Sequence, residues 1–226
     1  SGDDVGLGPQ KDQMKNILAF GDSLTWGYDA ASETRHPFEV RWPNVLADGL
    51  NFSVHMIAEG LNGRTTVFDD HSAASERNGA KMLPSLLATH EPLDLVIIML
   101  GTNDMREHIC GNAAGSAAGI GRLISIIKTF PYKANHAVPQ ILVVSPPLAE
   151  RGGDRFANHV MQGASSLSRQ YADAYKLVVE ENDVAFFDAA KHVIPDPMDG
   201  FHLDQENTKK LGEALIPVVG DLLTSK

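Results

Sequence analysis

Five short apolar segments, separated by longer amphipathic ones, constrain the fold of this chain more than any other feature. The apolar segments are rich in β-branched residues and nearly uninterrupted, as is typical of strands buried on both faces; they are residues 17–20, 54–58, 95–100, 141–145 and 184–187. The segments with helical periodicity are residues 42–50, 75–89, 114–129, 155–180 and 205–223. This alternation predicts an α/β fold, with a parallel sheet covered by helices on both faces. Within the last helix, Pro217 is predicted to cause a kink or a split.

The length of 226 residues suits one domain with a full core. We predict a single domain over residues 14–226, because Met14 has the character of a natural start. The preceding residues 1–13 are polar and glycine-containing, and we predict a disordered arm or a remnant of cloning there. No apolar run reaches the ~18 residues of a membrane span, and none after Met14 resembles a signal peptide. The expected location is the cytoplasm, with no membrane partner.

Charge and motif content exclude several functional classes. The formal net charge is -10 and no basic patch is visible, so we expect no nucleic-acid partner. A single cysteine, Cys110, cannot form an internal disulfide. The sequence has no GxxxxGK[ST] phosphate loop, no HExxH and no paired-cysteine metal pattern, and its glycine series at residues 111–121 does not lead from a strand into a helix. We therefore expect no metal and no cofactor.

Polar and glycine residues follow the predicted strands at the point where each strand ends. Gly21-Asp22-Ser23 follows the first strand, EGLNG the second and GTND the third, while DGFH at residues 199–202 comes after the fifth. In open α/β sheets, ligands bind at the carboxyl ends of the strands. We therefore expect these residues to meet at one edge of the sheet and to form the functional site.

Ser23, His202 and Asp199 are the candidates for a catalytic triad. A serine hydroxyl is a weak nucleophile and needs a neutral imidazole to take its proton during attack. Asp199 lies three residues before His202 and could accept the Nδ1–H of the imidazole, which leaves Nε2 to face Ser23. Alone, Asp199 would be read as a helix cap or an Asx-turn residue. Asp204 is the better cap candidate for the last helix, and Asp22 is expected to fix the turn around Ser23.

Acyl transfer also needs hydrogen-bond donors for the developing oxyanion. The candidates are the backbone N–H of Ser23, the backbone N–H of Gly63 and the side-chain amide of Asn103. For Gly63 and Asn103 taken singly, a turn role is the more ordinary interpretation. Their positions at matched strand ends predict an oxyanion hole, and the missing side chain of Gly63 would let a ligand approach closely. The neighbouring Arg64 is expected to form a salt bridge rather than to bind an anionic substrate.

Three aromatic residues lie beside these groups in the sequence. Trp26, Tyr28 and Phe201 are predicted to line a small apolar pocket for the acyl or alcohol part of a substrate. Core packing is an equal alternative for Trp26. Two loops, residues 30–38 and 149–158, are expected to shape specificity.

Four short blocks resemble the SGNH (GDSL-type) hydrolases: GDSL at 21–24, EGLNGRTT at 59–66, GTND at 101–104 and DGFH at 199–202. Together with FGDSLTWG, LPSLLATHEPLDLVIIMLGTND, ILVVSPP and FFDA, they are similar to the bacterial arylesterase branch, which includes acyltransferase–perhydrolase enzymes. The resemblance implies a flavodoxin-like three-layer α/β/α fold with a five-stranded parallel sheet. It also implies that Ser23 is the nucleophile, His202 the base and Asp199 its orienting partner, with Ser23, Gly63 and Asn103 as the oxyanion hole.

The function implied by the resemblance is a serine esterase acting through an acyl-enzyme on small-acyl esters of aryl and alkyl alcohols. The acyl acceptor would be water, an alcohol or a peroxide, which gives acyltransferase and perhydrolase side activity. The same branch implies a homo-oligomer, with an octamer as the expected form. The alternatives are a carbohydrate deacetylase or lysophospholipase of the same family, or a non-catalytic flavodoxin-like binding module.

Overall fold

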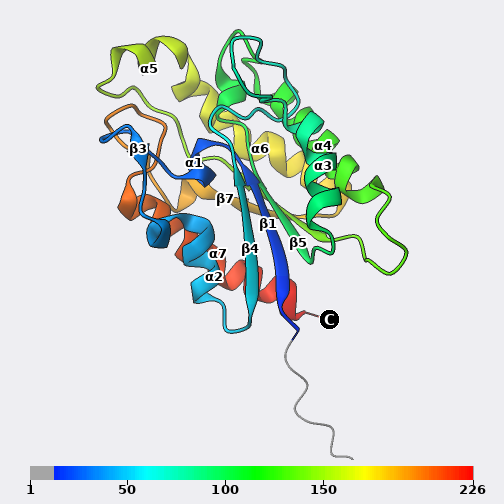
Figure 1. The fold of residues 1–226 in the computed structure, drawn as a ribbon. Helices are drawn as coiled ribbons and strands as arrows, with labels where there is room; N and C mark the ends of the chain where they lie inside the picture. Colours follow the sequence, from blue (N-terminus) through cyan, green and yellow to red (C-terminus); the bar gives the residue numbers. More distant parts are fainter. Residues whose placement is uncertain (1–12, 226) are drawn as a thin grey trace, which may run out of the picture.

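The computed structural model describes residues 13–225, and these residues contain a five-stranded parallel sheet in the order β4-β1-β5-β6-β7 (Figure 1). The strands are β1 (Lys15–Gly21), β4 (Val54–Gly60), β5 (Leu95–Met99), β6 (Gln140–Ser145) and β7 (Ala185–Asp188). All five predicted strands are confirmed, within a few residues at their ends. A separate hairpin pairs β2 (Tyr28–Asp29) with β3 (Thr34–Arg35). The arm predicted at residues 1–13 lies, apart from Gln13, outside the described residues.

Helices cover both faces of the sheet and complete the predicted three-layer architecture (Figure 1). One face carries α2 (Trp42–Gly49) and α7 (Gln205–Thr224). The other face carries α3 (Gly79–His90), α4 (Ala113–Thr129) and α6 (Ala164–Asn182). The short helical turns are α1 (Ser23–Trp26), α5 (Arg155–Val160), η1 (Phe38–Val40), η2 (Asn103–Met105) and η3 (Ala189–Lys191).

Successive strand residues point into two separate cores, which explains why the strands are apolar at every position. In β1, Leu18 and Phe20 pack with the α3, α4 and α6 layer, whereas Ile17 and Ala19 pack with the α2 and α7 layer. All four side chains are fully buried. Burying a side chain of this size stabilises the fold by roughly 1.5–3 kcal/mol for Leu, Ile or Phe. The double-sided burial fixes the sheet between its helices, so that the strand ends hold their loops at a constant edge.

Three helix predictions need correction. The helix predicted over residues 155–180 is two helices, because Gly163 has a left-handed φ of 81° and separates α5 from α6. The helix predicted from residue 75 begins at Gly79, where the Asn78 side chain accepts a hydrogen bond from the Ala80 N–H. Of the kink or split predicted at Pro217, the split does not occur, because α7 continues through the proline. The loss of one N–H there is tolerated since α7 stays buried on both sides of the proline, at Leu215 and Val219.

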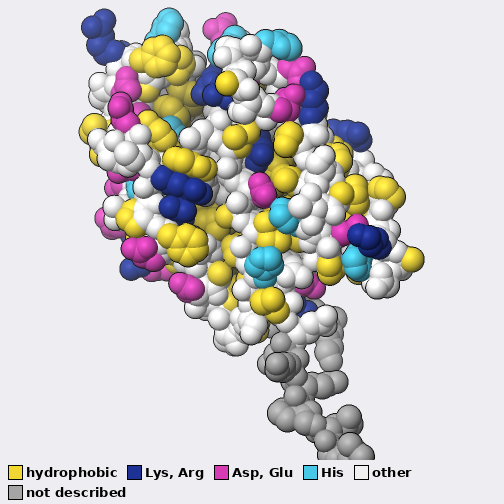
Figure 2. Space-filling view, viewed as in Figure 1, with side chains coloured by type: hydrophobic (Ala, Val, Ile, Leu, Met, Phe, Trp, Pro, Cys, Tyr) yellow, Lys and Arg dark blue, Asp and Glu magenta, His cyan; other side chains and the backbone are white. Residues whose placement is uncertain are grey.

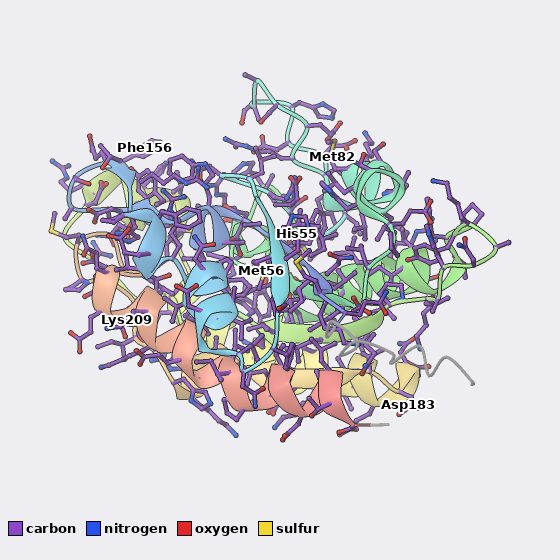
Figure 3. The ribbon with its side chains drawn as sticks, turned by 60° about the horizontal axis from the view of Figure 1, so that its bottom comes forward. His55, Met56, Met82, Phe156, Asp183 and Lys209 are labelled. Atoms are coloured by element: carbon purple, nitrogen blue, oxygen red, sulfur yellow. The ribbon has the colours of Figure 1, made fainter. Side chains whose placement is uncertain are left out.

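The two ends of the sheet are distinct in Figure 3. Phe156, in α5 after the carboxyl end of β6, and Asp183, two residues before the start of β7, lie at opposite ends of the molecule (Figure 3). His55 and Met56 lie on the edge strand β4. On the face seen in Figure 2, lysine and arginine side chains occur in small separate groups among acidic and apolar ones. Within residues 13–225, no helix combines the length and the apolar character needed to cross a bilayer.

Candidate active site

Ser23 begins a single helical turn directly after β1. The Asp22 carboxylate caps this turn, since its Oδ1 accepts a hydrogen bond of 3.0 Å from the Leu24 N–H. Gly27, with a left-handed φ of 96°, ends the turn. The expectation that Asp22 fixes the turn is therefore confirmed. The local sequence places the Ser23 hydroxyl at the carboxyl edge of the sheet on a rigid support.

Ser23, His202 and Asp199 form a connected chain of hydrogen bonds. The Ser23 Oγ lies 2.9 Å from the His202 Nε2, and the His202 Nδ1 lies 2.5 Å from the Asp199 Oδ2. The second oxygen of Asp199 accepts hydrogen bonds of 3.1 Å from the backbone N–H groups of Phe201 and His202. Asp199 is thus both an Asx-turn residue and the partner of the imidazole. Asp204 caps α7 as predicted, by accepting from the Asn207 N–H at 2.8 Å.

The charge on Asp199 is favoured by this arrangement. Partial burial acts to raise the pKa of Asp199, but the hydrogen bonds and the charge interaction with His202 lower it below its ordinary value overall. An ionised Asp199 holds the proton of the imidazole on Nδ1 and leaves the Nε2 lone pair directed at the Ser23 hydroxyl. The geometry can therefore support removal of the hydroxyl proton during nucleophilic attack.

The loop that carries Asp199 and His202 is bonded, backbone to backbone, to the loop at residues 150–154. The Glu150 N–H donates to the Gly200 carbonyl at 2.7 Å, and the Gly153 N–H donates to the Pro197 carbonyl at 2.9 Å. Gly200 has a left-handed φ of 88°, and a Cβ there would overlap the Glu150 carbonyl. Only glycine allows so close an approach of the two loops. The position of His202 therefore depends on a segment far from it in the sequence.

Gly63 and Asn103 lie in adjoining loops at the same edge. The Asn103 Nδ2 donates to the Arg64 carbonyl at 3.1 Å and lies 3.5 Å from the Asp22 Oδ2. Gly63 has a left-handed φ of 83°, and a Cβ on it would overlap the guanidinium of Arg77. The need for glycine was predicted, but its physical reason differs: the space beside Gly63 is filled by Arg77 rather than left open for a ligand. The structure brings the three predicted oxyanion donors to one edge of the sheet.

Arg64 holds the Gly63 loop against the strands. Its Nη1 donates to the carbonyls of Gly21 and Glu59, at 3.1 Å and 2.6 Å, and its guanidinium lies 4.5 Å from the centre of the Phe20 ring. Burial lowers the pKa of Arg64 to about 10. The hydrogen-bond partners of this guanidinium are backbone carbonyls, instead of the carboxylate of the predicted salt bridge.

Two buried carboxyl groups lie behind the predicted oxyanion donors. Burial raises the pKa of Asp22 to about 7, and the hydrogen bond from the Leu24 N–H opposes this effect in part. Burial also raises the pKa of Asp104, although hydrogen bonds from Thr66 and Ser116 lower it in part. Asp104 was not among the functional residues predicted from the sequence. An acidic residue a few positions after a fully apolar strand was the available signal for it.

The three aromatic candidates divide into two groups. The Tyr28 and Phe201 rings flank the imidazole of His202, with ring centres 4.5 Å and 4.3 Å from it. Trp26 is instead covered by Arg35, whose guanidinium lies 4.6 Å from the ring centre and whose Nε donates to the Trp26 carbonyl at 2.7 Å. Tyr28 and Phe201 are therefore the candidates that touch the triad, whereas the guanidinium of Arg35 covers Trp26.

A hollow of about 470 Å³ opens beside the triad. It is lined by Tyr28, Ala30, Ala31, Ser32, Glu33, Gly153, Asp154, Pro197, Met198 and Asp199. Both loops predicted to shape specificity contribute to this wall, together with the residues just before His202. Among residues 13–225, no group of three or more His, Cys, Asp or Glu side chains is arranged to hold a metal ion.

The chain is similar to known esterases over most of its length. Residues 19–207 match the model of the GDSL-like Lipase/Acylhydrolase family. A carbohydrate acetylesterase family member from Sinorhizobium meliloti is 45% identical, with a TM-score of 0.91 over 93% of this chain and 99% of the other. The aryl esterase of M. smegmatis is 39% identical, with a TM-score of 0.87 over 92% and 100% of the two chains. A second carbohydrate acetylesterase from S. meliloti is 37% identical, with a TM-score of 0.86 over 92% and 99%. No curated protein matches the chain.

Proposed function

We propose that this chain, which belongs to the GDSL-like lipase/acylhydrolase family, is a serine esterase that removes small acyl groups such as acetyl from aryl and alkyl alcohols. One observation carries the proposal. The Ser23 Oγ lies 2.9 Å from the His202 Nε2, while the Nδ1 of the same imidazole is bonded to a buried carboxylate. A serine needs this arrangement to become a nucleophile at neutral pH.

The reaction follows from the positions of these groups. The Ser23 Oγ attacks the ester carbonyl carbon while His202 takes the hydroxyl proton, and the carbonyl oxygen becomes an oxyanion. The Ser23 N–H, the Gly63 N–H and the Asn103 amide then donate to that oxygen. When the tetrahedral intermediate collapses, His202 protonates the departing alkoxide, and an acyl group remains on Ser23. A water molecule, whose proton His202 takes, then attacks the carbonyl carbon of this acyl-enzyme. The bond to the Ser23 Oγ breaks, His202 returns the proton to that oxygen, and the carboxylic acid leaves.

The leaving alcohol is expected to lie on the side of His202, because the imidazole must reach its oxygen to protonate it. Tyr28 and Phe201 flank the imidazole and supply apolar surface on that side. This favours aryl alcohols. The hollow beside Tyr28 is walled by Ser32, Glu33 and Asp154 as well, and these polar groups suit the hydroxyls of a sugar.

A carbohydrate acetate is therefore a second candidate substrate. Two of the similar structures, at 45% and 37% identity, are carbohydrate acetylesterases, and another is an aryl esterase. Comparing phenyl acetate with an acetylated methyl glycoside at matched concentrations would distinguish the two. A kcat/KM at least tenfold higher for one of them assigns the class of alcohol.

Transfer of the acyl group to an alcohol or a peroxide is a further part of the proposal. It requires that few waters compete for the acyl-enzyme. Exposed apolar side chains support it: Met198, which lines the hollow, is 49% exposed, and Phe156, two residues after the lining residue Asp154, is 73% exposed. Covering them with a second copy of the chain would narrow the entrance, so light scattering should give a mass well above 24.4 kDa, with an octamer as the expected form. In mostly aqueous buffer, vinyl acetate and benzyl alcohol should then yield benzyl acetate alongside acetate.

The primary test is labelling with a fluorophosphonate, read by intact mass and peptide mapping. One adduct on the Ser23 peptide is expected, with loss of p-nitrophenyl acetate hydrolysis in proportion to labelling. The Ser23→Ala variant should take up no label and lose activity, and it should retain the wild-type melting temperature. An active Ser23→Ala variant, or an adduct on another residue, would exclude the proposed nucleophile. Among p-nitrophenyl esters of increasing acyl length, the acetate should have the highest kcat/KM.

A further inference from the structure

Asp104 is a fully buried carboxyl group that takes no part in the proposed triad. It follows Asn103 directly in the loop after β5, and its side chain reaches the loop that carries Gly63. The Asp104 Oδ1 accepts a hydrogen bond of 3.0 Å from the Thr66 N–H. Its Oδ2 lies 2.6 Å from the Thr66 hydroxyl. One side chain thus connects the two loops that supply the predicted oxyanion donors outside Ser23.

The hydrogen bonds of Asp104 extend to two helices that cover the sheet, α4 and α6. The Asp104 Oδ2 also lies 2.8 Å from the Ser116 hydroxyl in α4, and that hydroxyl lies 2.8 Å from the Tyr175 hydroxyl in α6. The Tyr175 hydroxyl in turn lies 2.9 Å from the carbonyl of Leu100. Thr66, Ser116 and Tyr175 are all buried, so water cannot stand in for a missing partner.

Two glycines make room for this network. A Cβ on Gly101 would overlap the Tyr175 hydroxyl, and a Cβ on Gly119 would overlap the Thr66 hydroxyl. The φ of Gly101 is 135°, which disfavours any other residue there. The network therefore requires glycine at both positions, because any larger residue would displace one of its hydroxyl groups.

A count of hydrogens in this network indicates that Asp104 carries a proton. Four oxygen–oxygen contacts connect Asp104, Thr66, Ser116, Tyr175 and Leu100, and each needs one hydrogen. The three hydroxyls supply three hydrogens, because each hydroxyl carries one. An ionised carboxylate supplies none, so one short contact would be left with two oxygens facing each other. A proton on the Asp104 carboxyl group completes the set.

We propose that Asp104 is a neutral, protonated positioning residue that locks the Gly63 loop to the Asn103 loop and so holds the oxyanion donors in register. The inference rests on the proposed esterase function for its catalytic part, but the protonation state stands on the hydrogen-bond geometry alone. Displacing a donor by about 1 Å can cost on the order of 10²-fold in rate. A buried network with two helices as anchors prevents such a displacement.

The surroundings of Asp104 agree with a neutral group. The titratable groups near Asp104 include Asp22 after β1, Cys110 before α4, and Tyr171 and Tyr175 on α6. All four are acids, so none of them supplies a positive charge that would favour the ionised carboxylate. Burial raises the pKa of Asp104 in the same direction.

The protonation state is tested by ¹³C NMR of protein labelled at the aspartate carboxyl carbon. The Asp104 signal is identified by its absence from the spectrum of the Asp104→Asn variant. It is expected at the position of a protonated carboxyl group at pH 7, with no titration between pH 5 and pH 7. A signal that titrates near the ordinary value of an aspartate would overturn the proposal. This measurement needs no turnover, so it remains informative if the esterase proposal fails.

The positioning role is tested by kinetics. The asparagine of Asp104→Asn can accept from the Thr66 N–H and donate from its two amide hydrogens to the Thr66 and Ser116 hydroxyls. It therefore keeps the side chain neutral and leaves a hydrogen in each of the four contacts, although the hydroxyl hydrogen of Thr66 loses its acceptor in the network, and kcat should stay within about threefold of wild type. Asp104→Ala should lose roughly 10–100-fold in kcat per phosphonate-titrated site, with KM nearly unchanged. A loss in Asp104→Asn as large as in Asp104→Ala would overturn the positioning role of a neutral acid.

If Asp104→Ala does not fold, the Thr66→Val variant provides a second kinetic test of the positioning role. It removes one hydroxyl from the network while keeping the side-chain shape. Its kcat should fall by several-fold, and adding Asp104→Asn should cause little further loss, because both changes act on the same contact. Fully additive losses would show that Asp104 does not act through Thr66. If wild-type protein takes up no phosphonate, the esterase proposal itself fails.

Discussion

Replacing Asp22 by asparagine should remove part of the pH dependence of the free energy of unfolding. Asparagine caps a helix as well as aspartate does, so the hydrogen bond from the Leu24 N–H is retained. What is removed is a carboxyl group that is only 1% exposed and whose pKa burial raises from 3.8 to about 7. Between these two pH values, the folded protein holds a proton that the unfolded chain has released. The free energy of unfolding of the wild type therefore falls as the pH rises through this window.

The magnitude follows from the difference between the two pKa values. About three pH units, at 1.36 kcal/mol per unit, give an upper limit of about 4 kcal/mol. The asparagine variant lacks this loss. For a domain of this size, 1 kcal/mol changes the melting temperature by about 2–4 °C. The melting temperature of Asp22→Asn minus that of wild type should therefore be larger at pH 8 than at pH 4, by up to about 8–16 °C.

The assay is differential scanning calorimetry of both proteins between pH 4 and pH 8. The quantity of interest is the change with pH in the difference between the two melting temperatures, because constant effects of the substitution cancel. Asp154→Asn, which alters an exposed helix-capping aspartate, controls for the loss of one negative charge. A difference between Asp22→Asn and wild type that stays constant from pH 4 to pH 8 would show that Asp22 does not bind a proton in this window, and the burial argument would be wrong.

Three further predictions concern the catalytic groups. Asn103→Ala should lose about 10²–10³-fold in kcat, while its melting temperature falls by only a few degrees, because the side chain makes one short hydrogen bond, to a carbonyl; a variant whose main defect is unfolding would make Asn103 a structural turn residue. Gly63→Ala should lose both activity and stability, and Arg77→Ala should restore only part of the loss, since it removes the overlap but not the strain of the positive φ; full rescue would show that φ is not limiting. Asp199→Asn should lower kcat by roughly 10³–10⁴-fold with the fold intact, as measured by kinetics and circular dichroism, because the imidazole would lose its orienting partner; a drop of less than tenfold would remove Asp199 from the triad.

Most of the sheet was predictable from the sequence because each strand is buried on both faces. Such strands must be apolar at every position, and the runs of Ile, Val and Leu show this directly. The residues after the strands were also predictable as a group, because carboxyl ends of parallel strands share one edge. Ser23 and His202 are 179 residues apart, yet their positions after strands of one parallel sheet predicted that they would meet at the same edge. Their catalytic roles stay predictions that the proposed assays test.

The features that escaped prediction depend on contacts between distant segments. The break at Gly163 lies inside continuous helical periodicity, because α5 and α6 each keep an apolar face. The close approach of the Arg77 side chain to Gly63 depends on how a loop folds back. The network of Asp104 needs α4 and α6 to lie against the strand end, and periodicity gives no information about which polar groups then meet. Arg64 was predicted to form a salt bridge with a carboxylate, but its guanidinium donates hydrogen bonds to the carbonyls of Gly21 and Glu59 instead.

The bonding between the loop at residues 150–154 and the loop of Asp199 and His202 has a consequence for how such a protein can change over generations. The hollow beside the triad has two walls, one at residues 30–33 and one that includes Gly153 and Asp154. The second wall is bonded through its backbone to the residues just before His202, whereas the first is not. Mutations that adapt the hollow to a new alcohol through residues 153–154 will alter turnover at the same time. Selection for new substrates without a loss of rate should therefore accumulate changes at residues 30–33, and lineages should diverge there first.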